Sequence, residues 1–102
     1  KLRALGVHEI VLDPGFGFVK TIEHNYALLK NLQVFSNVTS LPILAGISRK
    51  SMICKVLGVK PDNALNGTTA LHMVALQQGA RILRVHDVRE AAEVIRLHQQ
   101  LV

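Results

Sequence analysis

Three short runs of apolar residues, each followed by charged or hydroxyl-bearing residues, constrain the fold of this chain more than any other feature. The runs are Glu9–Asp13, Leu41–Ile47 and Ile82–His86. Each run is nearly continuous in apolar side chains, which is typical of strands that are buried on both faces. Pro14 and Gly15 follow the first run directly and indicate a turn there. We therefore expect three buried strands, which is the pattern of a parallel sheet.

The segments between these runs carry apolar residues at helical spacing. Asp62 or Asn63 is expected to cap one of these helices, and Gly58 and Gly79 to end two of them. The expected helices begin at Thr21 with an apolar face through Leu32, and then span Ser51–Leu57, about Leu65 to Gln78, and Val88–Leu101. Strands that alternate with helices predict an α/β fold with parallel strands, and we expect residues 1–102 to form a single unit.

Composition limits the class of protein. The chain has 102 residues, of which 49% are hydrophobic and 19% are charged, as in a globular domain with one modest core. No apolar run approaches the ~20 residues of a membrane span, and no signal peptide is apparent, so a cytoplasmic protein is expected. Lys1 stands where a helix would already have begun, so we expect a piece of a longer protein. Cys54 is the single cysteine and is expected to fill space in the core.

The net charge of +5 favours an anionic ligand. Nucleic acid fits this chain poorly, because its cations are scattered and its four aromatic residues form no stacking platform. Among the histidines, His8, His24, His72 and His98 lack the spacing of metal ligands and are expected to be structural. The charge therefore leaves two alternatives, an anionic ligand or no particular charged partner.

Polar groups follow each expected strand. Asp13 ends the first, Ser48–Ser51 follow the second, and Arg84, His86 and Asp87 end the third. In parallel α/β proteins, ligands bind at the carboxyl ends of the strands. We therefore expect these groups to meet in one site.

The stretch GISRKSM, residues 46–52, packs two cations and two hydroxyl groups into a strand end. Such a cluster usually meets an anion, and Ser51 would begin a helix whose first N–H groups attract one. The alternative is a solvated turn with a helix cap. Arg49 either contacts a ligand or braces the loop.

The stretch RVHDV, residues 84–88, places Arg84 and His86 two positions apart. On a strand this spacing directs both side chains to one face and Val85 to the other. A guanidinium beside an imidazole suits a diphosphate. The alternative is a purely structural pair. Arg81 and Arg89 are expected to lie outside the strand.

Three stretches, DPGFGFVK (13–20), GISRKS (46–51) and RVHDV (84–88), together resemble the dihydropteroate synthase family. The family fold is a (β/α)8 TIM barrel, for which about 250 residues is typical. The resemblance therefore implies the C-terminal part of such a barrel, its last three βα units. It also implies the family's reaction, which condenses 6-hydroxymethyl-7,8-dihydropterin diphosphate with p-aminobenzoate and releases diphosphate.

The resemblance assigns pterin-binding roles to three residues. Asp13 would accept hydrogen bonds from a ring N–H and an exocyclic amine of the pterin, although an Asp at this position also suits a simple Asp-Pro-Gly turn. Lys50 would hydrogen-bond the pterin ring, and Gly46 would let a flat ring approach the backbone closely.

The resemblance places four further residues around the second substrate and the leaving group. Phe18 would approach the aminobenzoate pocket, and Ser51 would hold the aminobenzoate carboxylate. Arg84 and His86 would stabilise the departing diphosphate, so that Lys50, Arg84 and His86 carry the catalysis. Phe16 is expected to cover the core instead, and Asp87 to orient His86, to cap the last helix, or both.

The family also implies Mg²⁺ on the diphosphate, with metal ligands outside this chain. The small-molecule substrates would be the main partners, with no nucleic acid or membrane, and a homodimer is expected because an open sheet exposes apolar surface. The chain alone would be inactive. Two other interpretations stay open: a non-catalytic partial barrel, and a related pterin-binding methyltransferase domain, which would explain Asp13 but not Ser48–Ser51 or RVHDV.

Overall fold

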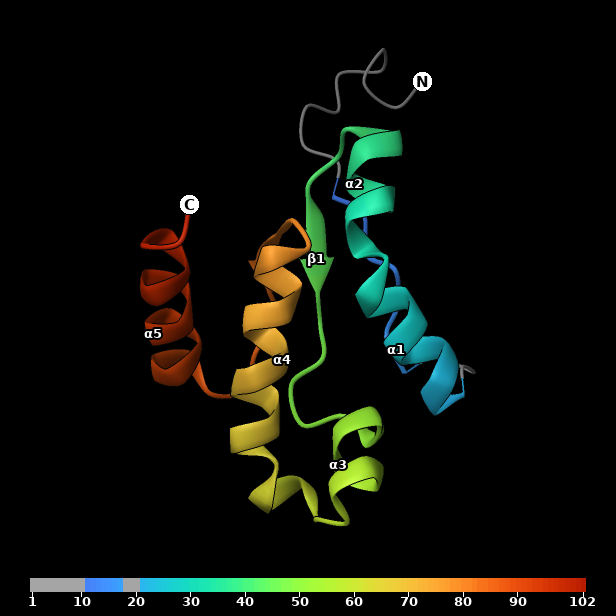
Figure 1. Cartoon of the computed structure of the whole chain (residues 1–102). Helices are drawn as coiled ribbons and strands as arrows, with labels where there is room; N and C mark the ends of the chain where they lie inside the picture. Colours follow the sequence, from blue (N-terminus) through green and yellow to red (C-terminus); the bar gives the residue numbers. More distant parts are fainter. Residues whose placement is uncertain (1–10, 18–20) are drawn as a thin grey trace.

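A computed structural model describes residues 11–17 and 21–102 of the chain. Helices outnumber strands in this part, and the C-terminus follows α5 at one edge of the molecule (Figure 1). The elements are α1 (Ile22–Lys30), α2 (Leu32–Thr39), β1 (Ile43–Ala45), α3 (Ser51–Leu57), the 3₁₀ turn η2 (Pro61–Asn63), α4 (Leu65–Gln77), β2 (Ala80–Leu83) and α5 (Val88–Gln99).

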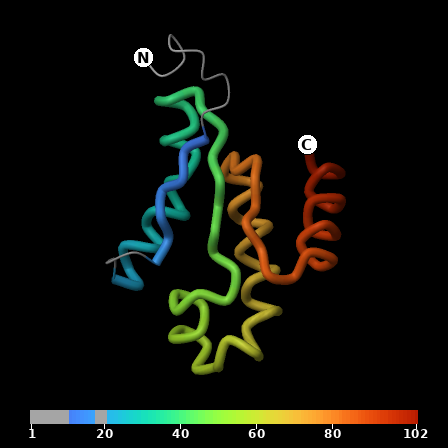
Figure 2. The backbone as a smooth tube through the Cα atoms, turned by 180° about the vertical axis from the view of Figure 1, so that it is seen from behind, coloured from blue at the N-terminus to red at the C-terminus, as the bar shows by residue number. Residues whose placement is uncertain are grey.

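Three chain segments run parallel at the centre of the fold. β1 pairs with β2, and Leu12 forms a parallel bridge to Ile43 on the other edge of β1. The Leu12 N–H donates to the Pro42 carbonyl at 2.8 Å, and the Leu44 N–H donates to the Leu12 carbonyl at 2.9 Å. Figure 2 shows the three segments side by side. The predicted α/β fold with parallel strands and covering helices is confirmed.

The strands are shorter than predicted, and the third is shifted. β2 begins at Ala80 and ends at Leu83, so Arg81 lies within it and Arg84 and His86 follow it. The prediction that Arg81 lies outside the strand was wrong. The Arg84 N–H still donates to the Ala45 carbonyl at 3.0 Å, so the pairing with β1 continues one residue past β2.

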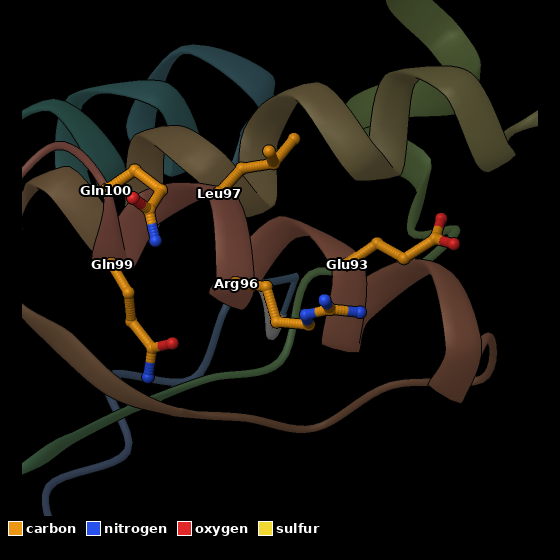
Figure 3. A pocket seen from close by; sticks show the side chains of 5 residues that line it. All are labelled: Glu93, Arg96, Leu97, Gln99 and Gln100. Atoms are coloured by element: carbon orange, nitrogen blue, oxygen red, sulfur yellow. The ribbon is translucent and has the colours of Figure 1, made fainter.

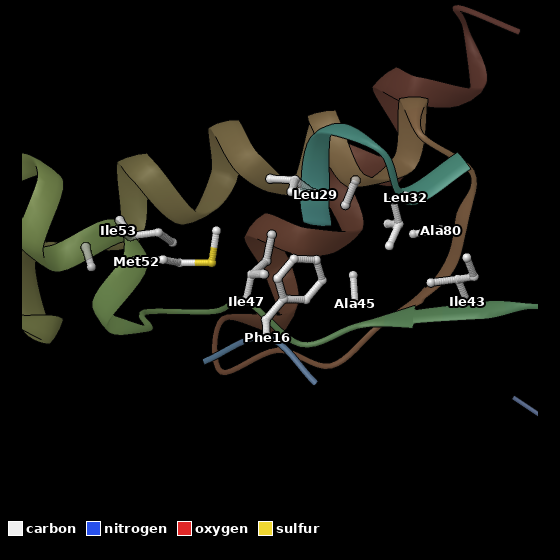
Figure 4. Close-up of a cluster of buried hydrophobic side chains, with 11 residues drawn as sticks. Phe16, Leu29, Leu32, Ile43, Ala45, Ile47, Met52, Ile53 and Ala80 are labelled. Carbon is white, nitrogen blue, oxygen red and sulfur yellow. The ribbon is translucent and has the colours of Figure 1, made fainter. Parts of the chain in front are cut away.

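The core lies between the strands and the helices (Figure 4). Ile43, Ala45 and Ile47 are fully buried and lie two residues apart, as expected for one face of a strand. Phe16 also packs into this cluster, which confirms its predicted role over the core. The helices contribute Leu29, Leu32, Met52, Ile53 and Ala75. Burying each large side chain stabilises the fold by roughly 1.5–3 kcal/mol.

The helix starts and stops follow their local sequence in most places. The Thr21 hydroxyl accepts a hydrogen bond from the His24 N–H at 3.1 Å and caps α1. Gly58 and Gly79 follow α3 and α4 with φ of 67° and 97°, a conformation that glycine adopts without strain. These helix-end predictions are confirmed.

Three helix predictions were wrong. A second helix, α2, follows α1 after a break at Asn31, where no helix was expected. Asp62 and Asn63 lie in the 3₁₀ turn η2, and α4 begins after Ala64, whose side chain has no capping group. α5 ends at Gln99, two residues before the predicted end at Leu101.

The packing of α3 against α4 depends on Gly67. A Cβ atom at this position would lie 2.6 Å from Ile53 Cγ2 and 2.9 Å from Leu57 Cδ1. A larger residue at this position would force the Ile53 and Leu57 side chains of α3 to shift. Since α3 follows directly on the GISRK segment, this contact helps to fix the position of Lys50. No helix in the ranges 11–17 and 21–102 is both long and apolar enough to cross a membrane.

Candidate active site

The segments that follow the three parallel strands come together, as the sequence predicts. Arg84 Nη1 lies 3.3 Å from Asp13 Oδ2, and so joins the first strand end to the third. The two side chains are 54% and 37% exposed. The pair is therefore a loose contact in solvent, and both groups are open to other partners.

Asp13 has a second contact within its own loop. Its Oδ1 accepts a hydrogen bond from the Gly15 N–H at 2.9 Å, which is the turn geometry that an Asp-Pro-Gly sequence favours. The structure therefore shows the turn, with the other carboxylate oxygen of Asp13 facing Arg84 at the strand ends. The pterin-binding role of Asp13 stays a prediction.

The loop after Asp13 is fixed by α1. Asn25 is buried, and its Oδ1 accepts a hydrogen bond from the Gly17 N–H at 2.8 Å while its Nδ2 donates to the Thr21 carbonyl. Gly17 has φ of 88°. Phe18, which the resemblance assigns to the aminobenzoate pocket, lies outside the described residues.

Gly46 is needed because of Arg84. A Cβ atom at Gly46 would lie 2.6 Å from Arg84 Nη2 and 3.1 Å from Arg84 Cζ. The flat group that lies against the Gly46 backbone here is the Arg84 guanidinium. The approach of a ligand ring to Gly46 stays a prediction. Any side chain at position 46 would displace Arg84.

Lys50 connects the second strand end to the first. It directly precedes α3, and its Nζ donates to the Phe16 carbonyl at 2.6 Å. A Cβ atom at Gly17 would lie 3.4 Å from Lys50 Cδ, so the lysine side chain passes close over this loop. The ammonium group is thus held between the two loops.

Two hollows share Lys50. The first, which we call the Arg84 hollow, has a volume of about 200 Å³. The second, the Ser51 hollow, has a volume of about 220 Å³. The Arg84 hollow is lined by Gly46, Ser48, Lys50, Arg84, Val85 and His86, and the Ser51 hollow by Phe16, Gly17, Lys50 and Ser51. Of the predicted site residues within the described ranges, only Asp13 lines neither hollow, and it contacts Arg84.

Arg84 and His86 enter the Arg84 hollow from the same segment, although β2 has ended before them. Both are exposed, whereas Val85 between them is half-buried. The His86 N–H donates to the hydroxyl of the buried Ser48 at 3.3 Å. Ser48 therefore links the third strand end to the second. Arg84 and His86 face the same hollow, although both lie after β2 and not on it.

Arg49 lies on the other side of the same segment. Its Nε and Nη2 donate to the two carboxylate oxygens of Asp87, each at 2.9 Å, and its Nη1 donates to the Pro61 carbonyl at 2.6 Å. Its side chain and that of Asp87 are 22% and 21% exposed. Of the two roles left open for Arg49, the structure shows the brace.

Asp87 uses its carboxylate for Arg49 and makes no side-chain capping bond to α5. The hydrogen bonds from Arg49, with the positive charge of that group, lower the pKa of Asp87 below its ordinary value. The same bonds raise the pKa of Arg49. Sequence reasoning missed this pair, although opposite charges that directly follow two neighbouring strand ends were a usable signal.

Two further groups lie near this network. His72 in α4 is 2% exposed, and its Nε2 has no hydrogen-bond partner within the part of the chain that the structure describes. Burial lowers its pKa and so favours the neutral form. Cys54 is half-buried, and its Sγ lies 3.6 Å from the Arg49 carbonyl.

One hollow lies far from these loops in the sequence. It has a volume of about 470 Å³ and is lined by Glu93, Arg96, Leu97, Gln99 and Gln100, all in α5 or directly after it (Figure 3). None of the predicted site residues that the structure describes lines it. As for metals, residues 11–17 and 21–102 contain no group of three or more His, Cys, Asp or Glu side chains that could hold an ion.

Comparisons with known proteins place this geometry in a family. The chain is 49% identical over 89 residues to the dihydropteroate synthase of Escherichia coli, and these aligned residues cover 87% of this chain and 31% of that protein. It is 46% identical over 90 residues to the dihydropteroate synthase of Haemophilus influenzae, with coverage of 88% and 32%. The chain thus spans about a third of the length of the curated relatives it matches.

Solved structures agree in fold. A Yersinia pestis dihydropteroate synthase with a pterine-sulfa conjugate superposes with a TM-score of 0.86 at 44% identity, covering 89% of this chain and 36% of that one. The dihydropteroate synthase of Thermus thermophilus superposes with a TM-score of 0.88 at 44% identity, covering 99% and 42%. These neighbours are TIM-barrel enzymes, so the predicted fold class, part of a (β/α)8 barrel, is confirmed. The family model for pterin binding enzymes matches residues 1–86, and the chain belongs to that family.

Proposed function

We propose that this chain is part of a dihydropteroate synthase, which joins 6-hydroxymethyl-7,8-dihydropterin diphosphate to p-aminobenzoate. The observation that carries the proposal is the position of Lys50, which lines both the Arg84 hollow and the Ser51 hollow. An enzyme that couples two small molecules needs two adjoining subsites with the reacting atoms near their boundary. The name of the ligand in the Yersinia pestis structure, a pterine-sulfa conjugate, describes a molecule of two such parts.

In this proposal the Arg84 hollow takes the pterin diphosphate. Asp13 and Lys50 hold the pterin, and Arg84 and His86 bind the diphosphate. The exposure of Asp13 and Arg84 supports this assignment, because their mutual contact at 3.3 Å is loose enough for a ligand to replace or join it. The guanidinium over Gly46 presents a flat donor surface that suits both a phosphate and an aromatic ring.

The Ser51 hollow takes the aminobenzoate. The exposed Ser51 would hold its carboxylate, and Phe18, beyond the described residues, would approach its ring. The aromatic amine then attacks the methylene carbon attached to the pterin. A C–N bond forms, the C–O bond to diphosphate breaks with its electron pair on the leaving group, and the proton that the amine loses passes to solvent. Arg84 and His86 stabilise the departing charge.

The resemblance implies Mg²⁺ on the diphosphate. The described residues offer no group of three or more acidic, His or Cys side chains for it. The roles given above to Asp13, Lys50, Ser51, Arg84 and His86 therefore do not include binding of a metal ion.

We propose in addition that residues 1–102 form a single unit, that they are inactive by themselves, and that they associate as a homodimer. Asp13, Arg84 and His86 stand exposed on one side, so a closed pocket needs further walls. Leu97 and Leu101 at the end of the chain are 63% and 65% exposed, and apolar surface of this kind favours association. Gel filtration of the chain should therefore show a dimer or larger species, and a stable monomer would contradict this.

The proposed reaction can be tested in a hybrid synthase, the Escherichia coli enzyme in which this chain replaces the segment that it matches. The hybrid should form dihydropteroate from the two substrates. Lys50→Ala should lower kcat/KM for the pterin substrate roughly 10- to 100-fold, because a charge-assisted hydrogen bond contributes about 1.5–3 kcal/mol. Lys55→Ala is the matched control, since Lys55 lies one turn further along α3 and lines neither hollow. A folded hybrid without activity, or an unchanged kcat/KM for Lys50→Ala, would refute the assignment.

A further inference from the structure

Two side-chain contacts extend the alignment of β1 with β2 beyond the strands themselves. Ala45 lies opposite Leu83 in the sheet. Past the strands, Ser48 accepts a hydrogen bond from the His86 N–H, and Arg49 binds Asp87. All three contacts join residues that are 38 positions apart in the sequence. The register of the sheet is therefore carried into the loops by side chains.

The Arg49–Asp87 ion pair is the stronger of the two side-chain contacts. It has two parallel N–H to carboxylate bonds at 2.9 Å, and such bidentate pairs fix both distance and orientation. The third guanidinium nitrogen, Nη1, donates to the Pro61 carbonyl, which lies in the connection between α3 and α4. A lysine could not make these bonds together, because it lacks the planar fork.

The backbone at Arg49 requires this support. Arg49 has φ of 54°, a left-handed conformation that is unfavourable for residues with a side chain. Its N–H donates to the hydroxyl of the buried Thr68 at 3.0 Å. This conformation directs the Arg49 side chain toward Asp87, while the neighbouring Lys50 extends to Phe16 and lines both hollows.

We propose that Arg49 and Asp87 are positioning residues that set the geometry of the GISRKS segment relative to the RVHDV segment. This inference rests on the proposed function. Lys50 and Ser51, on one segment, would hold the pterin and the aminobenzoate, and Arg84 and His86, on the other, would hold the leaving diphosphate. Arg49 directly precedes Lys50 and Asp87 directly follows His86, so the ion pair sets the distance between the groups that would hold the two substrates. Neither residue lines the Arg84 hollow or the Ser51 hollow, so neither need touch a substrate.

The kinetic prediction follows from this separation of roles. Arg49→Lys and Asp87→Asn in the hybrid synthase should each lower kcat by roughly tenfold or more, because misalignment reduces the rate of a coupling reaction strongly. The KM for each substrate should change only about twofold to threefold, since every proposed binding group is still present. The double variant should be no slower than the slower single variant, because both changes break the same contact.

Arg89→Lys is the matched control. Arg89 lies two residues after Asp87 and pairs with Glu93 at 3.7 Å, but both side chains are largely exposed. Its replacement should leave kcat unchanged. Additive effects of Arg49→Lys and Asp87→Asn, or a rise in KM with kcat unchanged, would overturn the positioning role.

A second measurement does not depend on activity. In the 102-residue chain, Asp87→Asn should speed amide hydrogen exchange at Arg49 and Lys50, which lie on the other segment, and Glu93→Gln should not. Exchange coupling in the chain together with an inactive hybrid would refute the proposed function and support the ion pair as the link between the segments. Unchanged exchange at Arg49 and Lys50 would overturn the inference whatever the kinetics.

Discussion

Two Arg–Asp pairs join strand ends in this molecule, and they differ in almost every physical respect. Arg49 and Asp87 make two hydrogen bonds at 2.9 Å with side chains 22% and 21% exposed. Arg84 and Asp13 make one contact at 3.3 Å with side chains 54% and 37% exposed. The first pair is part of the framework. The second is open to solvent and lies beside the Arg84 hollow.

The difference shows how one type of ion pair serves two purposes. A guanidinium whose nitrogens are all used within the protein, as in Arg49, has little left to offer a ligand. An exposed guanidinium with a single long contact loses little when a ligand replaces that contact, because exposed ion pairs contribute about 0–1 kcal/mol. Residue type alone does not distinguish the structural role of Arg49 from the proposed binding role of Arg84. The number and length of their hydrogen bonds do.

The comparison predicts its largest effect for the replacement of Arg84, which should change the affinity for diphosphate. In the hybrid synthase, Arg84→Ala should weaken diphosphate binding roughly 10- to 100-fold, since a hydrogen bond to a charged group contributes about 1.5–3 kcal/mol. Isothermal titration calorimetry measures the change. Higher salt should reduce a loss that comes from general surface charge more than one that comes from a pocket contact.

Arg81→Ala is the control for this prediction. Arg81 lies on the same strand segment but lines a separate hollow with Ser36, Ser40, Leu41 and Pro42, at the start of β2. Its removal should alter diphosphate binding little. Equal losses for Arg81→Ala and Arg84→Ala, both abolished by salt, would mean that Arg84 belongs only to a basic surface.

The meeting of the strand ends could be predicted from the sequence because it depends on two simple facts. Apolar runs that alternate with helices form parallel strands, and parallel strands end at one edge of the sheet. These facts brought together Asp13, Lys50 and Arg84 without any knowledge of side-chain positions. The roles of Phe16 and Arg49 were also predictable, the first from its apolar character and the second as one of two stated options.

The details that depend on long-range packing could not be predicted. β2 begins at Ala80 because pairing with Ile43 determines the strand, and the apolar run from Ile82 gives no sign of it. α2 forms although its sequence contains β-branched and polar residues, since Leu32 is anchored in the core. Asp87 binds Arg49, 38 positions away, whereas local reasoning offered only its neighbours as partners.

A smaller expected effect is a difference in the free energy of unfolding when each ion pair is broken. Asp87→Asn should lower the free energy of unfolding of the chain at pH 7, because it removes one side of a half-buried bidentate pair. Asp13→Asn should change it by less than about 1 kcal/mol, as expected for an exposed pair with a single contact. Urea denaturation monitored by circular dichroism measures both. A larger loss for Asp13→Asn would reverse the comparison.

The pH dependence of the same variants gives the last and smallest test. Arg49 lowers the pKa of Asp87 in the folded chain, so the stability that Asp87 provides is complete above its ordinary value of about 3.9 and is lost as the pH falls through the lowered value. The stability curves of the wild type and Asp87→Asn should therefore converge at low pH. His72 causes a separate loss below about pH 6.5, because burial lowers its pKa while the unfolded chain takes up the proton. Measuring both proteins in a His72→Gln background removes that second titration, and curves that then stay parallel down to acidic pH would show that the ion pair does not stabilise the fold.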